Sequence, residues 1–231
     1  YIYFARPDST IGGQNVYECR KALGHQLALE SHVNADMVIP VPDSGVPAAI
    51  GYAETSNLPF ELGIIRNHYV GRTFIEPRQS IRALSVKLKH NANHMLLKNK
   101  KVILIDDSIV RGTTSTKIVQ MVRDAGASEV HMRIAAPPIT HSDFYGVDTP
   151  SRDQLLAANY SLDEMCKRIG TNSLKFLSIN GLYLAMGHKN GRNSKYPEYT
   201  DHCFTGDYPT RLQDQNSDKN IRQLSFLYEQ K

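Results

Sequence analysis

The sequence has few cysteines, no long apolar run and only a modest net charge. Its three cysteines, Cys19, Cys166 and Cys203, are far apart and form no Cys-x-x-Cys pair. This spacing argues against a zinc knuckle and a disulfide framework, and it favours a reducing compartment. No apolar run approaches membrane-spanning length, and no secretory signal pattern is present. We therefore expect a cytoplasmic protein with no membrane partner.

The charge balance argues against nucleic acid as a partner. The formal net charge is only +4 over 231 residues, and no Lys/Arg run with interleaved aromatic residues occurs. Nucleic-acid binding is therefore not expected, whereas a small polyanionic substrate is favoured. The length suffices for one large or two small domains. The chain begins at Tyr1 rather than Met, with an apolar, strand-like Tyr1–Phe4, so we expect a fragment of a longer protein.

The most informative stretch is residues 102–114. Val102–Ile105 is apolar and mostly β-branched, which predicts a strand buried on both faces. Asp106 and Asp107 follow where that strand should end, and a short turn containing Gly112 comes next. Apolar residues then recur at helical spacing up to Gly126, a typical helix stop.

Each part of this unit has a chemical use. Backbone N–H groups of the turn and the helix N-terminus form an anion site, and Gly112 allows close approach of a phosphate. Hydroxyl donors come from Ser108, Thr113 and Thr114. Asp106 and Asp107 lie where parallel sheets bind ligands, and adjacent carboxylates suit ribose hydroxyls or hydrated Mg²⁺. The alternative is an acidic strand end with an ordinary helix cap; the whole run favours the phosphate site.

A second turn has similar chemistry. Met37–Ile39 predicts a strand and Val46–Ala53 a helix, with Pro40–Gly45 between them. That turn contains an acid, a hydroxyl and a glycine, namely Asp43, Ser44 and Gly45. Alone it could be only a turn, but it could share a sheet edge with Asp106.

The stretch 66–82 is basic, with five cationic or imidazole side chains among aromatic residues, Gly and Pro. It has no apolar period. A solvated basic loop is one interpretation. The other, which we favour, is a lid that closes over a polyphosphate and excludes water.

The order of elements predicts an α/β fold. Strands and helices alternate through residues 35–136, which indicates a mainly parallel central sheet with right-handed crossovers. We expect a core domain at 1–138 and a C-terminal α-rich segment at 139–231, packed on the core. In that segment Ser161 and Glu164 predict a capping box. Its histidines, His141, His188 and His202, have no metal-binding spacing.

The run 102–114 resembles the phosphoribosyl pyrophosphate (PRPP) signature of type I phosphoribosyltransferases. The resemblance implies that Asp106 and Asp107 hold the ribose hydroxyls, directly or through Mg²⁺. It implies a 5-phosphate cradle of Ser108, Ile109, Val110, Arg111, Gly112, Thr113 and Thr114. It also implies a pyrophosphate loop of Asp43, Ser44 and Gly45, with Ser44 reaching the metal.

Further segments resemble one subfamily, the glutamine PRPP amidotransferases. They are Tyr3–Ser9, Pro40–Gly45, Tyr69–Ile75, Asp143–Asp148 and Cys203–Thr210. The resemblance implies a flexible lid formed by Tyr69, Gly71, Arg72 and Thr73, with Arg72 as a catalytic residue. It implies displacement of pyrophosphate from PRPP by ammonia derived from glutamine, the first step of purine biosynthesis. It further implies homo-oligomers and feedback inhibition by purine nucleotides.

Two departures from the family are visible. The glutaminase half, which precedes this region in the family and would be the partner domain, is absent from the sequence given. One branch of the family carries an iron–sulfur cluster, but Asp143 stands where a cysteine is needed, and only Cys203 remains in the 193–203 stretch. One cysteine cannot hold a cluster that takes four thiolates. We expect Mg²⁺ and no iron–sulfur cluster.

Two alternatives stay open. A salvage phosphoribosyltransferase would share the PRPP turn and use a nucleobase as nucleophile. A PRPP-sensing regulator would bind PRPP without turnover. Asp106, Asp107 and Arg72 favour the enzyme.

Overall fold

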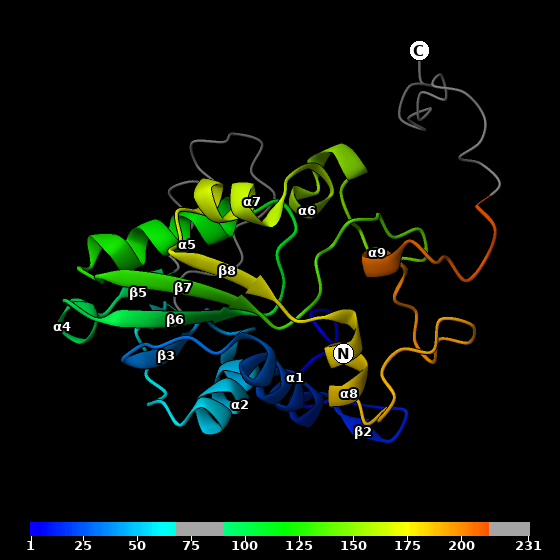
Figure 1. Cartoon of the computed structure of the whole chain (residues 1–231), viewed down its shortest axis with the longest axis horizontal. Coiled ribbons are helices and arrows are strands. Elements are labelled where there is room, and N and C mark those ends of the chain that lie inside the picture. Colours follow the sequence, from blue (N-terminus) through cyan, green and yellow to red (C-terminus); the bar gives the residue numbers. More distant parts are fainter. Residues whose placement is uncertain (68–89, 213–231) are drawn as a thin grey trace, which may run out of the picture.

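The structure, a computed structural model, describes residues 1–67 and 90–212. At its centre four parallel strands are ordered β3–β6–β7–β8. They are β3 (Met37–Pro40), β6 (Lys101–Asp106), β7 (Glu129–Ile134) and β8 (Ser173–Phe176). Helices α1 (Val16–Ser31) and α2 (Val46–Ser56) cover one face, and α5 (Thr113–Asp124) and α7 (Leu162–Ile169) cover the other (Figure 1). The predicted α/β class with a mainly parallel sheet is confirmed.

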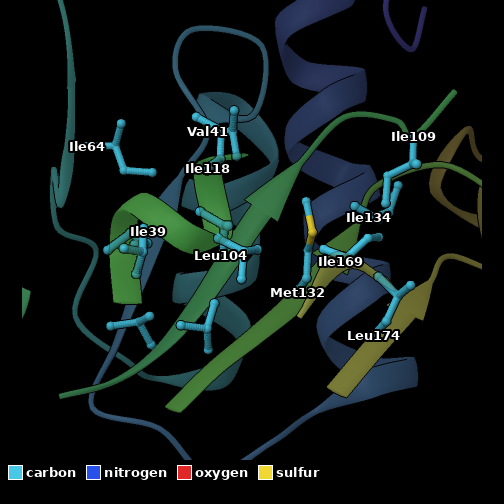
Figure 2. Packing of buried hydrophobic residues seen from close by; sticks show 14 of the residues in the cluster. Ile39, Val41, Ile64, Leu104, Ile109, Ile118, Met132, Ile134, Ile169 and Leu174 are labelled. Carbon is cyan, nitrogen blue, oxygen red and sulfur yellow. The ribbon is translucent and has the colours of Figure 1, made fainter. Parts of the chain in front are cut away.

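The strands of the sheet are apolar because both faces are buried. Along β6, Val102 and Leu104 belong to the cluster under α5 and α7, whereas Ile103 and Ile105 belong to the cluster under α1 and α2. Figure 2 shows the first cluster, with Leu104 and Met132 from adjacent strands among its members. This alternation explains why β6 has a continuous apolar run rather than a period of two.

The fourth strand, β8, comes from the stretch that the sequence assigns to the α-rich segment. It pairs with β7 in parallel register, from His131 opposite Ser173 to Ile134 opposite Phe176. The strand is short, and only Leu174 in it is buried. Lys175 is exposed, so the apolar signal is too weak to predict a strand. The segment after residue 138 therefore also completes the central sheet.

Local capping signals were reliable. The side chain of Asn15 accepts a hydrogen bond from the N–H of Glu18 at the start of α1. Ser161 and Glu164 form the predicted capping box of α7, which ends at Gly170 in a left-handed conformation. These signals predict boundaries well because the interactions are local in sequence.

Helices α1 and α2 cross with their backbones in close contact. A Cβ atom added at Gly24 would lie 1.9 Å from the carbonyl oxygen of Ala48, and one at Gly51 would lie 2.0 Å from that of Lys21. No side chain larger than hydrogen fits at either position. The two glycines thus set the distance between the helices.

Short elements complete the described chain. Strands β1 (Thr10–Ile11) and β2 (Gln14–Asn15) pair with each other, as do β4 (Ile64–Arg66) and β5 (His90–Ala92). The short helical elements are α4 (His94–Leu97), η1 (Arg152–Gln154), α6 (Leu156–Asn159), α8 (Ile179–Ala185) and α9 (His202–Thr205). Within the described ranges no helix has both the length and the apolarity needed to cross a membrane.

The strand-like start of the chain, Tyr1–Phe4, forms no strand. The buried guanidinium of Arg20 instead donates to the carbonyl oxygens of Tyr1 and Ala5, at 2.8 Å each. Later in the chain, Phe60 makes an isolated bridge with Val38, and strand β4 begins at Ile64. Apolar composition alone therefore does not specify a strand.

The C-terminal part after α8 has little regular structure but is well anchored. Arg192 forms a two-pronged ion pair with Asp201, with nitrogen–oxygen distances of 2.6 and 3.2 Å. The hydroxyl of Tyr183 donates to the same carboxylate at 2.8 Å, and that of Thr205 donates at 3.1 Å. The polar composition of this part of the chain therefore gives no sign that Asp201 is buried and hydrogen-bonded by several side chains.

Candidate functional site

Two turns lie side by side at the carboxyl edge of the sheet. Pro40, the last residue of β3, pairs with Ile105 of β6, so the chain leaves both strands at the same place. The N–H of Val41 then donates to the carbonyl oxygen of Ile105 at 2.7 Å. A Cβ atom at Gly45 would lie 2.4 Å from that oxygen, so the glycine is required for the approach of the turns. The predicted juxtaposition of the second turn with Asp106 is thus present.

The turns border a cavity of about 570 Å³. Its wall contains the whole predicted phosphate turn, Ser108 to Thr114, together with Asp106, Asp107 and Ser44. It also contains Val41, Pro42, His90, Ser115, Asp148 and Pro150. The residues predicted from the 102–114 run therefore meet at one concave site.

The phosphate turn has the geometry of an anion site. Gly112 has a φ of 78°, a left-handed conformation, and precedes Thr113, the first residue of α5. The first N–H groups of a helix have no partner within the helix, and the first residues of α5, Thr113 to Ser115, line the cavity. The side chain of Arg111 is exposed beside them. The turn can thus bind a phosphate through backbone donors.

Two carboxylates share the edge of β6. Asp106 is buried, and burial, followed by the charge of Asp107, raises its pKa well above the usual range. Burial also raises the pKa of Asp107, although the hydroxyl of Ser108 and the charge of Arg20 oppose the shift. The hydroxyl of Ser108 donates to Asp107 at 2.8 Å, and the N–H of Asp107 donates to Asp106 at 2.9 Å. The pair is poorly compensated and would be stabilised by a cation.

The predicted pyrophosphate loop is divided in the structure. Ser44 lines the cavity, and its side chain lowers the pKa of both carboxyl groups against the larger effect of burial. Asp43 and Gly45 are not among the cavity-lining residues. The carboxylate of Asp43 instead forms an ion pair with the guanidinium of Arg66 on β4. Gly45 is buried against β6.

The structure adds residues that the sequence interpretation missed. His90 lines the cavity, and its Nε2 lies 3.4 Å from the carbonyl oxygen of Pro42. Asp148 and Pro150 reach the wall from the loop after β7. Little in the sequence pointed to these two residues as part of the site, because they are distant in sequence from both turns. The matched segment Asp143–Asp148 was the only indication.

The predicted lid residues Tyr69, Gly71, Arg72 and Thr73 lie outside the described residues. Both flanks of that stretch are described. Arg66 pairs with His90 across the β4–β5 ladder, and both contact the turn after β3. Of these two flanking residues, His90 lines the cavity and Arg66 contacts the turn after β3 through Asp43.

The oxygen donors around the cavity suit a hard metal ion. In the described part of the chain, no group of three His, Cys, Asp or Glu side chains is arranged to hold an ion. The two carboxylates and the Ser44 hydroxyl supply hard oxygen donors, which suit Mg²⁺ held partly by substrate oxygens.

Solved structures share the fold of this chain. A glutamine PRPP amidotransferase from B. subtilis, solved with ADP and GMP, is 50% identical, and the match covers 93% of this chain and 47% of that one with a TM-score of 0.83. A structure described as the allosteric regulatory enzyme of purine biosynthesis gives 49% identity, coverage of 94% and 46%, and a TM-score of 0.82. The fold is that of a phosphoribosyltransferase.

Relatives of similar sequence show which family of phosphoribosyltransferases the chain belongs to. The amidophosphoribosyltransferase of Rhizobium etli is 62% identical over 228 residues, covering 98% of this chain and 46% of the relative. That of Archaeoglobus fulgidus is 51% identical, covering 92% and 46%. No protein-family model matches. The chain belongs to the amidophosphoribosyltransferase family and spans about half the length of the curated relatives it matches, corresponding to their phosphoribosyltransferase half.

Proposed function

We propose that the chain carries the synthase step of an amidophosphoribosyltransferase. Ammonia attacks C1 of PRPP, the bond from C1 to the pyrophosphate oxygen breaks, and 5-phosphoribosylamine, pyrophosphate and a proton are released. The observation that carries the proposal is the cavity in which the phosphate turn meets Asp106 and Asp107. In a longer protein, a glutaminase domain would supply the ammonia, and the step would begin purine biosynthesis.

The roles follow from charge and geometry. The backbone donors of 108–114 bind the 5-phosphate and fix the ribose. Asp106 and Asp107 accept from the ribose hydroxyls, and their negative charge stabilises the positive charge that develops on the ring. The Ser44 side chain lies on the side where the second turn would receive pyrophosphate. Mg²⁺, when bound by these oxygens, would neutralise charge on the leaving group. Ammonia needs no general base to attack.

Arg66 adds a feature to this proposal. Its guanidinium holds the carboxylate of Asp43, so the second turn presents no uncompensated negative charge toward an incoming pyrophosphate. Asp43 thereby supports the turn, and Arg66 supplies positive charge close to the leaving group.

The remaining expectations are part of the same proposal. They are a homo-oligomer in the cytoplasm, purine nucleotides as inhibitors, and glutamine as the ultimate nitrogen donor. The B. subtilis neighbour was solved with ADP and GMP, which supports a nucleotide-binding role in this family.

The test is pyrophosphate release from PRPP and Mg²⁺, with ammonium chloride, glutamine or a panel of nucleobases as second substrate. We expect release with ammonia and none with glutamine. Release only with a nucleobase would indicate salvage activity. Tight PRPP binding without any release would indicate a regulator.

The lid hypothesis has its own test. Replacing Arg72 with Ala should increase PRPP hydrolysis relative to amination by roughly tenfold, because a lid cation that excludes water would be missing. Product analysis of phosphoribosylamine against free ribose 5-phosphate measures the ratio. An unchanged ratio would contradict a lid function for this residue.

A further inference from the structure

One wall of the cavity is a loop without helix or strand, residues 142–150. It contributes Asp148 and Pro150 to the cavity. Its tip is poorly buried: the side chains of Phe144 and Tyr145 are 47% and 45% exposed, and a Cβ atom at Gly146 would meet no neighbour. Ring contacts of Phe144 and Tyr145 with Tyr208 and His202 still leave nearly half of each of these two residues exposed, so packing alone fixes the tip weakly. Hydrogen bonds must hold this wall loop in place.

Asp143 organises these hydrogen bonds. Its Oδ2 accepts from the N–H of Val147 at 2.7 Å and from that of Tyr145 at 3.0 Å. Its own N–H donates to the hydroxyl of Thr149 at 2.6 Å. Burial opposes ionisation of Asp143, but these donors and His202 outweigh it and lower its pKa. Through its carboxylate and its own N–H, Asp143 thus connects the start of the wall loop to its middle and its end.

The remaining oxygen of Asp143 binds an element far away in sequence. Nε2 of His202, the first residue of α9, lies 2.6 Å from Oδ1 of Asp143, and both side chains are at least nine-tenths buried. The imidazole stacks on Tyr208 at 5.1 Å and meets the edge of Tyr145 at 5.1 Å. The hydroxyl of Tyr208 donates to the carbonyl oxygen of Ser142 at 2.9 Å. The histidine is held in one orientation from several sides.

α9 is itself fixed to the rest of the molecule. Asp201, the residue before it, is paired with Arg192 and Tyr183, and Sγ of Cys203 lies 4.0 Å from the hydroxyl of Tyr3. The carbonyl oxygen of Cys203 accepts from the N–H groups of Thr140 and His141, just before the wall loop. His202 therefore projects from a rigid base toward a loop that has little support of its own.

We propose that the His202–Asp143 pair is a positioning element that fixes the wall loop and thereby sets the affinity of the cavity for PRPP. The inference rests on the proposed function, because it assumes that PRPP occupies this cavity. Neither residue lines the cavity, so both act through Asp148 and Pro150. A displaced wall loop weakens the binding of PRPP and of the transition state equally, so KM for PRPP rises while kcat changes little.

The test uses two substitutions that separate the hydrogen bond from the ring. His202→Phe keeps the aromatic stacking and removes the donor, whereas His202→Gln keeps an N–H donor and removes the ring. We expect H202F to raise KM for PRPP about fivefold or more with kcat within about twofold, and H202Q to stay within about twofold in both. Pyrophosphate release at varied PRPP, with saturating ammonium chloride and Mg²⁺, measures both constants.

A matched control removes a hydrogen bond that supports α9 instead of one that holds the wall loop. Tyr183→Phe deletes the hydroxyl that donates to Asp201, next to His202. It should lower the melting temperature and leave KM unchanged. Equal rises of KM in H202F and Y183F, or in H202F and H202Q, would show general damage and overturn the inference. An unchanged KM in H202F would overturn it as well.

A substitution on the loop side covers the possibility that H202F does not fold. Thr149→Val removes the acceptor for the N–H of Asp143 and leaves α9 intact. KM should rise by about threefold. An unchanged KM in T149V would contradict the proposal.

A direct binding measurement separates this inference from the proposed function. Calorimetric titration of PRPP with Mg²⁺ should show weaker binding by H202F than by H202Q, by the same factor as KM. If the unaltered chain binds PRPP but releases no pyrophosphate with ammonia, the proposed function fails and the binding comparison still decides the inference. Equal affinities of the two variants would refute the positioning role.

Discussion

Asp106 and Asp201 are both buried carboxylates, 7% and 2% exposed, but they lie in opposite surroundings. Asp201 is bound by Arg192, Tyr183 and Thr205, and these partners outweigh burial and lower its pKa. Burial raises the pKa of Asp106, and the charge of the neighbouring carboxylate, Asp107, raises it further. The first centre is satisfied within the fold. The second remains in need of a cation or of hydroxyl donors from a ligand.

We call the surroundings of Asp201 the stabilising centre, and those of Asp106, where we propose that PRPP binds, the binding centre. A buried charge with matched partners contributes to a unique structure, and removing one partner leaves the other uncompensated. A buried charge without partners lowers stability and is retained where a ligand supplies the compensation. Substitutions of Asp106 and Asp107 should therefore mainly reduce activity, whereas substitutions of the partners of Asp201 should mainly reduce stability.

The largest effect should come from removing both carboxylates of the binding centre. The double substitution Asp106→Asn and Asp107→Asn should decrease pyrophosphate release at least about a thousandfold, because the charge that stabilises the developing cation is lost. Circular dichroism should show an intact fold. Asp153→Asn, at an exposed position, is the control. Activity within about twofold of the unaltered chain would make the site assignment wrong.

The next effect concerns the stabilising centre. Arg192→Met should lower the free energy of unfolding by about 3 kcal/mol or more, because Asp201 would stay buried without its cation. Urea denaturation measures the change. Arg168→Met is a suitable control, since Arg168 is exposed and lies over the ring of Tyr160 at 3.6 Å. A loss as small in R192M as in R168M would remove the distinction between the two buried acids.

A third prediction depends on pH. The pKa of Asp106 is raised in the folded chain, so stability falls as the pH rises from the unfolded-state pKa of about 3.9 toward the raised value. Asp106→Asn should therefore be more stable than the unaltered chain by about 1–2 kcal/mol at pH 8. The advantage should shrink on acidification and disappear below about pH 3.9, where the carboxyl is protonated in both states. Urea midpoints across this range measure it, and an advantage that grows on acidification would contradict the assignment.

The smallest effect should come from one hydroxyl of the stabilising centre. Thr205→Val removes a donor to Asp201 but leaves Arg192 and Tyr183 in place. We expect a loss of about 0.5–1 kcal/mol in the free energy of unfolding and no change in PRPP affinity. A loss comparable to that of R192M would mean that the hydroxyl, rather than the ion pair, carries the compensation.

The binding centre was predictable from the sequence and the stabilising centre was not. Strand, acid pair, turn and helix follow one another within residues 102–124, so local patterns sufficed to assemble the phosphate turn. Arg192 and Asp201 lie in a stretch that composition describes only as polar. Their pairing depends on where α8 ends and α9 begins, which no local period encodes.

The same limit applies inside the site. Ser44 lines the cavity because strand ends in parallel sheets meet at one edge. The ion pair between Asp43 and Arg66 could not be predicted in the same way. Arg66 belongs to the β4–β5 ladder, whose two strands lie on either side of the 68–89 stretch in the sequence. His90 and Asp148 likewise reach the cavity from distant elements. Such contacts between distant residues appear only when the whole fold is known.

The crossing of α1 and α2 has a consequence for engineering heat resistance. Replacing a helical glycine with alanine commonly raises stability by about 0.4–1 kcal/mol, chiefly because the unfolded chain loses freedom. At Gly24 and Gly51 the added methyl group would meet backbone oxygens at 1.9 and 2.0 Å, so the expected gain becomes a loss. The chain accepts two weak helix formers so that its helices can touch, and a survey guided by helix propensity alone would select two of its least replaceable positions.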